Sequence, residues 1–156
     1  MTKTAGEINF TFVTVVNAIA ALTFSGIAVK SLDEVPENAL LLCPILYPKP
    51  DGFISGLSPS LETFGTFGTE QMTLRYNLTF RYLHSQISGG LGGLFQVYAG
   101  LITNVAAIAK IIMTNDTLSG ADNVRLQTIT QIGPTSDPAG NQYHGCDFIV
   151  SVEEYT

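Results

Sequence analysis

The strictest pattern in the sequence is an alternation of apolar and polar side chains from Met72 to Tyr82. Successive side chains of a β-strand point to opposite faces of a sheet, so a sustained period of two is typical of a strand. The pattern predicts one long strand with its apolar face in the core. The polar face carries Arg75 and Arg81, and it is a candidate inter-subunit or channel-facing surface.

Two apolar segments have helical spacing instead. The first predicted helix runs from about Ala5 to Phe24, and the second runs from Leu94 to about Asn115. The stretch from Ile8 to Val29 carries no charge, so its composition is similar to that of a signal peptide or a membrane span. Its polar residues gather on one side of a helical wheel, which favours an amphipathic helix of a globular domain and no membrane contact.

Further strands and one irregular stretch complete the chain. The strands are expected at Ile27 to Ser31, Leu40 to Tyr47, Asn123 to Ile132 and Tyr143 to Glu153, with a type I turn at Asp137-Pro138-Ala139-Gly140. The residues from about 48 to 70 show no periodicity and hold three prolines and four glycines. A loop of this length is unusual inside a compact domain. Because it also carries apolar residues, we expect an extended arm or long hairpin that lies on a neighbouring subunit.

These elements predict a single α+β domain over residues 1–156. Their order is α-β-β-(arm)-β-α-β-β, an antiparallel sheet of long strands packed with two helices. The charged share is only 13%, whereas roughly 25% is usual for a soluble domain. So few charges cannot cover a full water-facing surface, which indicates that part of the surface faces other protein. The seven Lys and Arg residues are scattered and the net charge is −6, so specific DNA binding is not expected.

The sequence shows little that could carry chemistry. The glycine cluster at 89–93 precedes a predicted helix, but Leu94 and Phe95 occupy the places where a phosphate-binding loop needs Lys and Ser or Thr. Cys43 and Cys146 are interpreted as reduced, buried thiols. We predict no cofactor, no metal and no enzymatic activity. A nucleophilic pair of Cys146 with His84 stays open as the alternative, in which the chain is a small enzyme.

Two segments resemble the small neck proteins of siphophages. They are the stretch from Ala39 to Gly52, which contains CPILYPKPDG, and the stretch from Asp137 to Asp147, DPAGNQYHGCD. The order of elements also resembles the tail-terminator (tail-completion) proteins. The resemblance implies a homohexameric ring in the virion that stops growth of the tail tube. Its partners would be the tail tube protein and the head-completion protein, and DNA would pass through the lumen without specific binding.

The expected subunit contacts follow from the arm and from the polar face of the long strand. Phe53, Phe64 and Phe67 are predicted to lie against an adjacent subunit, and Arg75 and Arg81 to pair with acidic residues across the same junction, because arginine and aromatic residues are the usual anchors of interfaces. Another neck subunit or a tail-tube subunit is the alternative within structural proteins.

Overall fold

A computed structural model describes residues 12–22, 24, 26–39, 42–64, 69–87, 94–114, 123–130 and 132–155. Within these residues, seven strands form one sheet, and two α-helices pack with it. The α-helices are α1 (Phe12–Ala20) and α2 (Leu94–Met113), with a 3-10 turn η1 (Leu32–Glu34). The strands are β1 (Ala28–Val29), β2 (Ile45–Pro48), β3 (Ile54–Phe64), β4 (Thr69–Gln86), β5 (Asn123–Ile129), β6 (Gly133–Ser136) and β7 (Gln142–Tyr155).

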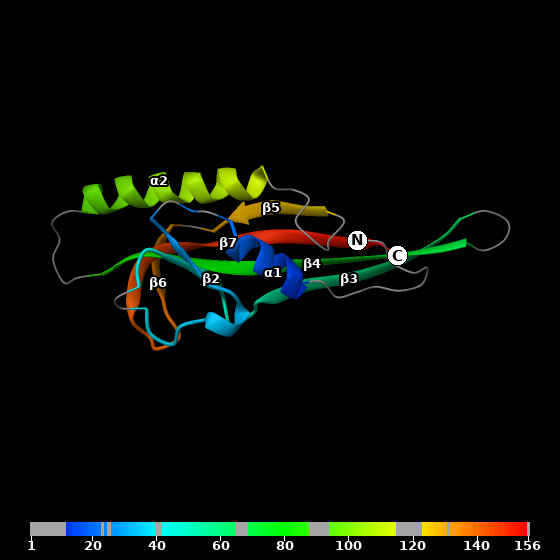
Figure 1. Cartoon of the computed structure of the whole chain (residues 1–156), viewed down its shortest axis with the longest axis horizontal. Helices are drawn as coiled ribbons and strands as arrows, with labels where there is room; N and C mark the ends of the chain where they lie inside the picture. Colours follow the sequence, from blue (N-terminus) through cyan, green and yellow to red (C-terminus); the bar gives the residue numbers. More distant parts are fainter. Residues whose placement is uncertain are drawn as a thin grey trace.

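The sheet is built around the two long strands β4 and β7 (Figure 1). These strands pair antiparallel from Thr73 opposite Tyr155 to Gln86 opposite Tyr143. On its other edge β4 pairs first with β3 and then with β2, and β7 pairs in the same way with β5 and β6. Only the short pair of β1 and β2 is parallel. The long antiparallel pair thus forms the centre of the sheet, and β2, β3, β5 and β6 pair along its two outer edges.

The alternation that predicted the long strand is confirmed by burial. The apolar positions of β4 from Leu74 to Tyr82 are at most 7% exposed, and they share a core with alternate residues of β7 such as Phe148 and Val150. The helices cover this apolar face. α1 contributes Val15, Val16 and Ile19, and α2 contributes Leu101, Val105, Ile108 and Ile112. Each buried aliphatic side chain contributes roughly 1.5–3 kcal/mol relative to leaving it exposed.

The predicted α+β class is confirmed, but several element boundaries differ from the prediction. The stretch predicted as an arm contains β3, and the stretch predicted as two closing strands contains three. The strand expected from Leu40 begins only at Ile45, because the amide of Leu42 bonds to the carbonyl of Ala39 and forms a turn there. The first helix is described from Phe12, and its predicted residues 5–11 lie outside the described part of the chain.

A second, smaller core lies at one end of the sheet. It consists of Ala39, Ile45, Tyr47, Leu83 and Tyr143. The predicted turn closes over it, and its Gly140 amide donates to the Asp137 carbonyl oxygen at 3.0 Å. The strands approach closely here, since a Cβ on Gly145 would overlap the carbonyl oxygen of Tyr82. Only glycine fits at this contact between β4 and β7.

Candidate functional site

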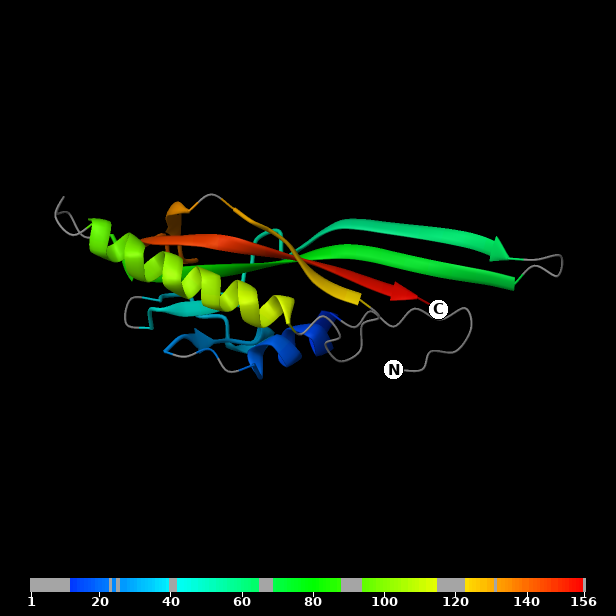
Figure 2. The same cartoon turned by 90° about the horizontal axis from the view of Figure 1, so that it is seen from above.

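The most distinctive surface is a two-stranded arm formed by the outer part of the β3–β4 hairpin (Figure 2). β7 supports β4 only from Thr73 onward, whereas β3 and β4 continue to pair out to Phe64 and Thr69. At roughly 3.3 Å per residue, the ribbon from Thr73 to Thr69 extends about 13 Å past the last β7 pair. An isolated two-stranded ribbon is marginally stable in water. This arm therefore gains stability from any surface on which it lies.

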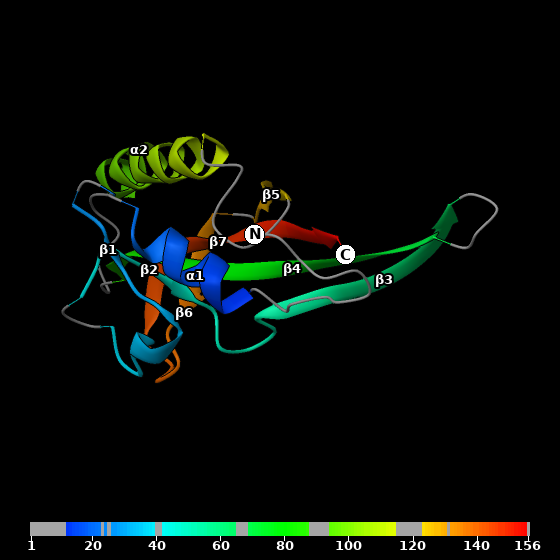
Figure 3. The same cartoon turned by 45° about the vertical axis from the view of Figure 1, so that its right-hand side comes forward.

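The arm exposes apolar side chains. Leu61, which pairs with Met72 beyond the last β7 pair, is 62% exposed. Leu57 is 56% exposed on the inner part of β3, where β7 still flanks β4. All residues from 55 to 61 are exposed. The stretch predicted as an arm or long hairpin contains β3, which pairs with the long strand β4, and Figure 3 shows this hairpin leaving the body of the sheet. Its contact with a neighbouring subunit stays a prediction.

The predicted role of Phe53 needs correction. This ring is partly buried against its own core and meets Phe80 edge to face, with ring centroids 6.0 Å apart. It precedes β3, where the chain still lies against the body, so it does not project toward another subunit. The side chain of Phe64 and the whole of Phe67 lie outside the described residues. Leu57 and Leu61 are among the apolar residues on which the predicted arm rests, but only the phenylalanines were expected to form the subunit contact.

Arg75 has an acidic partner within its own chain, whereas the prediction expected one across an interface. Its Nε lies 2.7 Å from Oε1 of Glu153, its register partner on β7. The Tyr155 hydroxyl also donates to Glu153, at 2.6 Å. This hydrogen bond and the Arg75 guanidinium lower the pKa of Glu153 although burial opposes them. Because the Arg75 side chain is 62% exposed, the ion pair contributes little to stability.

Arg81 also corrects the interface prediction. Its Nε and Nη2 donate to the two carboxylate oxygens of Asp147 at 2.9 and 3.1 Å, and its Nη1 donates to the Ser136 carbonyl at 2.9 Å. The hydrogen bond to Asp147 raises the pKa of Arg81, although burial opposes it. The bidentate pair joins β4 to β7, and the bond to Ser136 links β6 to them. Arg81 lines a pocket of about 320 Å³ with Tyr47 and Lys49, but three of its donors are already used inside the chain.

The cysteine and histidine of the enzyme alternative lie in a packed environment. Cys146 is 2% exposed, and burial raises its pKa to about 12, so its thiol is protonated at neutral pH. The Asn104 side-chain amide donates to the Tyr82 hydroxyl at 2.9 Å, and the same hydroxyl oxygen lies 2.7 Å from Nδ1 of His84, with which it forms a hydrogen bond. Burial, and then the charge of His144, lower the pKa of His84. This arrangement disfavours Cys146 as a nucleophile.

The other candidate groups have structural surroundings. Cys43 and Cys146 are both free thiols, and Cys146 is buried as predicted, whereas Cys43 is only partly buried. No three His, Cys, Asp or Glu residues gather at a possible metal site in the described ranges. None of the described helices is long and apolar enough to cross a membrane.

Asp137 is the most heavily bonded carboxylate near the pocket, and the sequence reasoning placed it only in a turn. It is 4% exposed and accepts hydrogen bonds from the Ala39 amide, the Tyr143 hydroxyl, and the amide and side chain of Asn141. Burial would raise the pKa of Asp137, but these donors together lower it. The carboxylate therefore joins two distant segments while it stays ionised.

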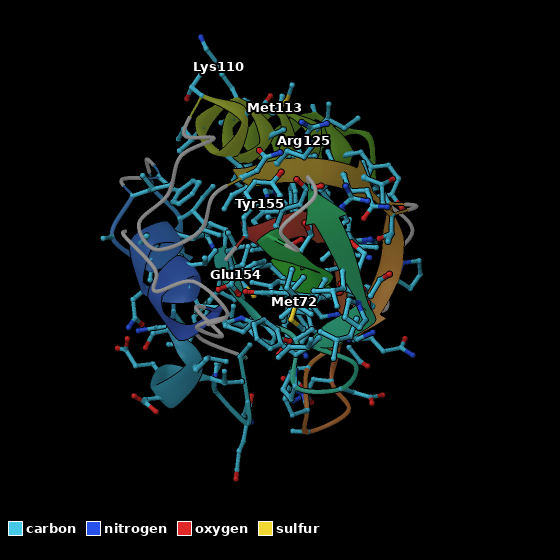
Figure 4. All side chains as sticks on the ribbon, turned by 90° about the vertical axis from the view of Figure 1, so that its right-hand side faces the viewer. Met72, Lys110, Met113, Arg125, Glu154 and Tyr155 are labelled. Carbon is cyan, nitrogen blue, oxygen red and sulfur yellow. The ribbon has the colours of Figure 1, made fainter. Side chains whose placement is uncertain are left out.

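The outer face of α2 is a second exposed apolar surface. Ile102 is 55% exposed and Met113 is 65% exposed, and Ala99, Ala106 and Ala107 are exposed between them. The outer face of this helix is therefore largely apolar. Figure 4, viewed from the end that bears the arm, shows Lys110 and Met113 on α2 above Arg125 on β5.

Comparison with known proteins does not assign the chain to a group. No protein-family model and no curated protein matches the sequence.

Proposed function

We propose that this chain is a ring-forming structural subunit of a siphophage neck, a tail terminator that caps the tail tube. In this role it offers one surface to the tail tube protein and another to the head-completion protein. The single observation that carries the proposal is the β3–β4 hairpin, with exposed Leu61 on its two-stranded outer part and exposed Leu57 on the inner part of β3. In an isolated subunit such an arm makes no contact beyond the chain itself. In a ring, the same arm can contact the neighbouring subunit.

The scarcity of charge supports the same proposal. Charged residues make up 13% of the chain, and the arm and the outer face of α2 both present apolar side chains to solvent. Contiguous exposed apolar surface usually marks a site of protein association. Two such surfaces on one small chain favour an assembly in which each copy has two neighbours.

The two segments that resemble siphophage neck proteins pack on each other. The amide of Ala39 donates to Asp137 at 2.9 Å, and the amide of Ala139 donates to the carbonyl of Glu37 at 2.9 Å. Tyr47 and Tyr143 lie in the same small core. The resemblance therefore rests on one compact structural unit of the fold. These contacts hold the fold together, as expected of a structural protein, and none of them requires a catalytic role.

The oligomeric state of the purified full-length chain tests the proposal. Size-exclusion chromatography with light scattering, together with negative-stain microscopy, is expected to show a hexameric ring. The double variant Leu57→Ser/Leu61→Ser should shift the protein toward monomer, because the arm loses its apolar contacts. Leu42→Ser is the matched control, since Leu42 is 41% exposed but lies off the arm. A wild-type protein that stays monomeric at high concentration would contradict the proposal.

Mixing with purified tail tubes separates the terminator from a tail-tube subunit. A terminator should bind at one end of a preformed tube and stop its extension. A tube subunit should instead polymerise into further tube. Microscopy of the mixture counts ends and lengths, so lengthening tubes would favour the tube subunit over the terminator.

A further inference from the structure

The outer face of α2 is apolar and has basic but no acidic residues around it. The helix and the neighbouring strand β5 carry one basic residue each, Lys110 and Arg125, and no acidic residue. Neither cation forms an ion pair within the described part of the chain. Ile102, Ala106, Lys110 and Met113 recur at helical spacing on the solvent side. This surface is apolar, with a positive charge at its edge.

The arm has the opposite charge and the same apolar character. Between Ile54 and Leu74 the only charged residues are Glu62 and Glu70, and no basic residue occurs. Among the described side chains of β3, Leu57 and Leu61 are the large hydrophobic ones that are exposed. An acidic, apolar ribbon is therefore complementary to an apolar helix face that carries isolated cations.

The geometry prevents these two surfaces from meeting within one copy. α2 lies over the half of the sheet that is farther from the hairpin tip, and the arm points away from it (Figures 1 and 2). A contact between them has to join two molecules. Because the two surfaces are different patches, the contact is head-to-tail, and repetition produces a closed ring when the rotation between copies allows it.

We propose that the arm of one copy lies along the outer face of α2 of the next copy, with Leu61 near Ile102 and the acidic arm near Lys110. This inference rests on the proposed ring function and names the contact that builds the ring. The partner of the arm is therefore a second copy of this chain. If the arm instead binds a tail-tube or head-completion subunit, the proposed contact is overturned.

Engineered disulfides test the contact directly. A chain that carries both Leu61→Cys and Ile102→Cys is assembled, oxidised and separated on a denaturing gel without reductant. A disulfide requires Cα atoms within about 7 Å, so linkage reports the docking position itself. We expect a ladder of covalent oligomers that ends at the size of the ring, and no ladder for either single variant. The pair Leu42→Cys/Ile102→Cys is the control, because Leu42 lies off the arm.

The outcomes separate the contact from the ring. Rings seen by microscopy without a 61–102 ladder would overturn the docking position and leave the proposed function intact. A ladder of equal yield from the control pair would also overturn it, because random collision would then explain the linkage. A monomer by light scattering at every concentration would overturn both the contact and the ring.

Discussion

Asp137 links residues 98 positions apart through one buried carboxylate, since it accepts from the amide of Ala39. Removal of its charge in Asp137→Asn should lower the free energy of unfolding at pH 7 by about 1–3 kcal/mol, because buried donors lose their acceptor. Urea denaturation measures this change. Asp33→Asn is the matched control, since Asp33 is exposed, and it should unfold like the wild type.

The pH dependence of the same variant has a defined sign. Hydrogen bonds lower the pKa of folded Asp137, so its stabilising contribution is present above the unfolded value of about 3.9 and is lost as the pH falls through the folded value. The difference in free energy of unfolding between the wild type and Asp137→Asn should therefore shrink below about pH 4. If this free-energy difference stays constant down to pH 2, an ionised Asp137 is contradicted.

Gly145 is required by the approach of two backbones. A Cβ here would overlap the Tyr82 carbonyl oxygen, and the side chain of Thr135 is 3.1 Å from the same point. Gly145→Ala should cost about 1–3 kcal/mol, as expected for overpacking, and should lower the midpoint of thermal unfolding. Gly133 on β6 pairs with Gly145 on β7 but has open space where a Cβ would lie. Gly133→Ala should therefore leave the midpoint of thermal unfolding nearly unchanged.

At the scale of elements, α2 separates stability from assembly. Ile108 is fully buried and Ile102 is 55% exposed on the same helix. Ile108→Ala should lower the free energy of unfolding by about 2–5 kcal/mol. Ile102→Ala should change it by less than about 0.5 kcal/mol while weakening assembly. Denaturation at low protein concentration and light scattering at high concentration measure the two effects, and equal destabilisation by both changes would contradict the burial of only one face.

The long strand was predictable because its period depends only on local backbone geometry. The prediction extended from Met72 to Tyr82, and the strand extends further, from Thr69 to Gln86. The extra residues lie where β3 and β7 supply pairing partners, as Thr69 faces Phe64 and Gln86 faces Tyr143. A strand end is set by the neighbour that satisfies its hydrogen bonds, and the alternation of side chains does not record that neighbour.

At the scale of the whole molecule, charge reversal tests the head-to-tail contact. Glu70→Lys and Lys110→Glu should each raise the protein concentration at half-assembly by about two- to fivefold, the effect of losing one partly exposed ion pair. The chain that carries both changes should return close to the wild-type value, because the reversed charges face each other again. Light scattering over a dilution series measures the midpoint. Two impaired single variants with no recovery in the double variant would contradict this pairing.

The sequence by itself determined the α+β class, the long alternating strand, the helical character of α2 and the turn at 137–140. These features follow from side-chain periodicity and from proline and glycine geometry, which act over a few neighbouring residues. Only the tertiary structure decided that Arg75 pairs with Glu153 and Arg81 with Asp147, and that Phe53 turns into its own core. Those partners lie on strands that become adjacent only after the sheet forms. Their identity depends on strand order and register, and no local pattern in the sequence encodes either one.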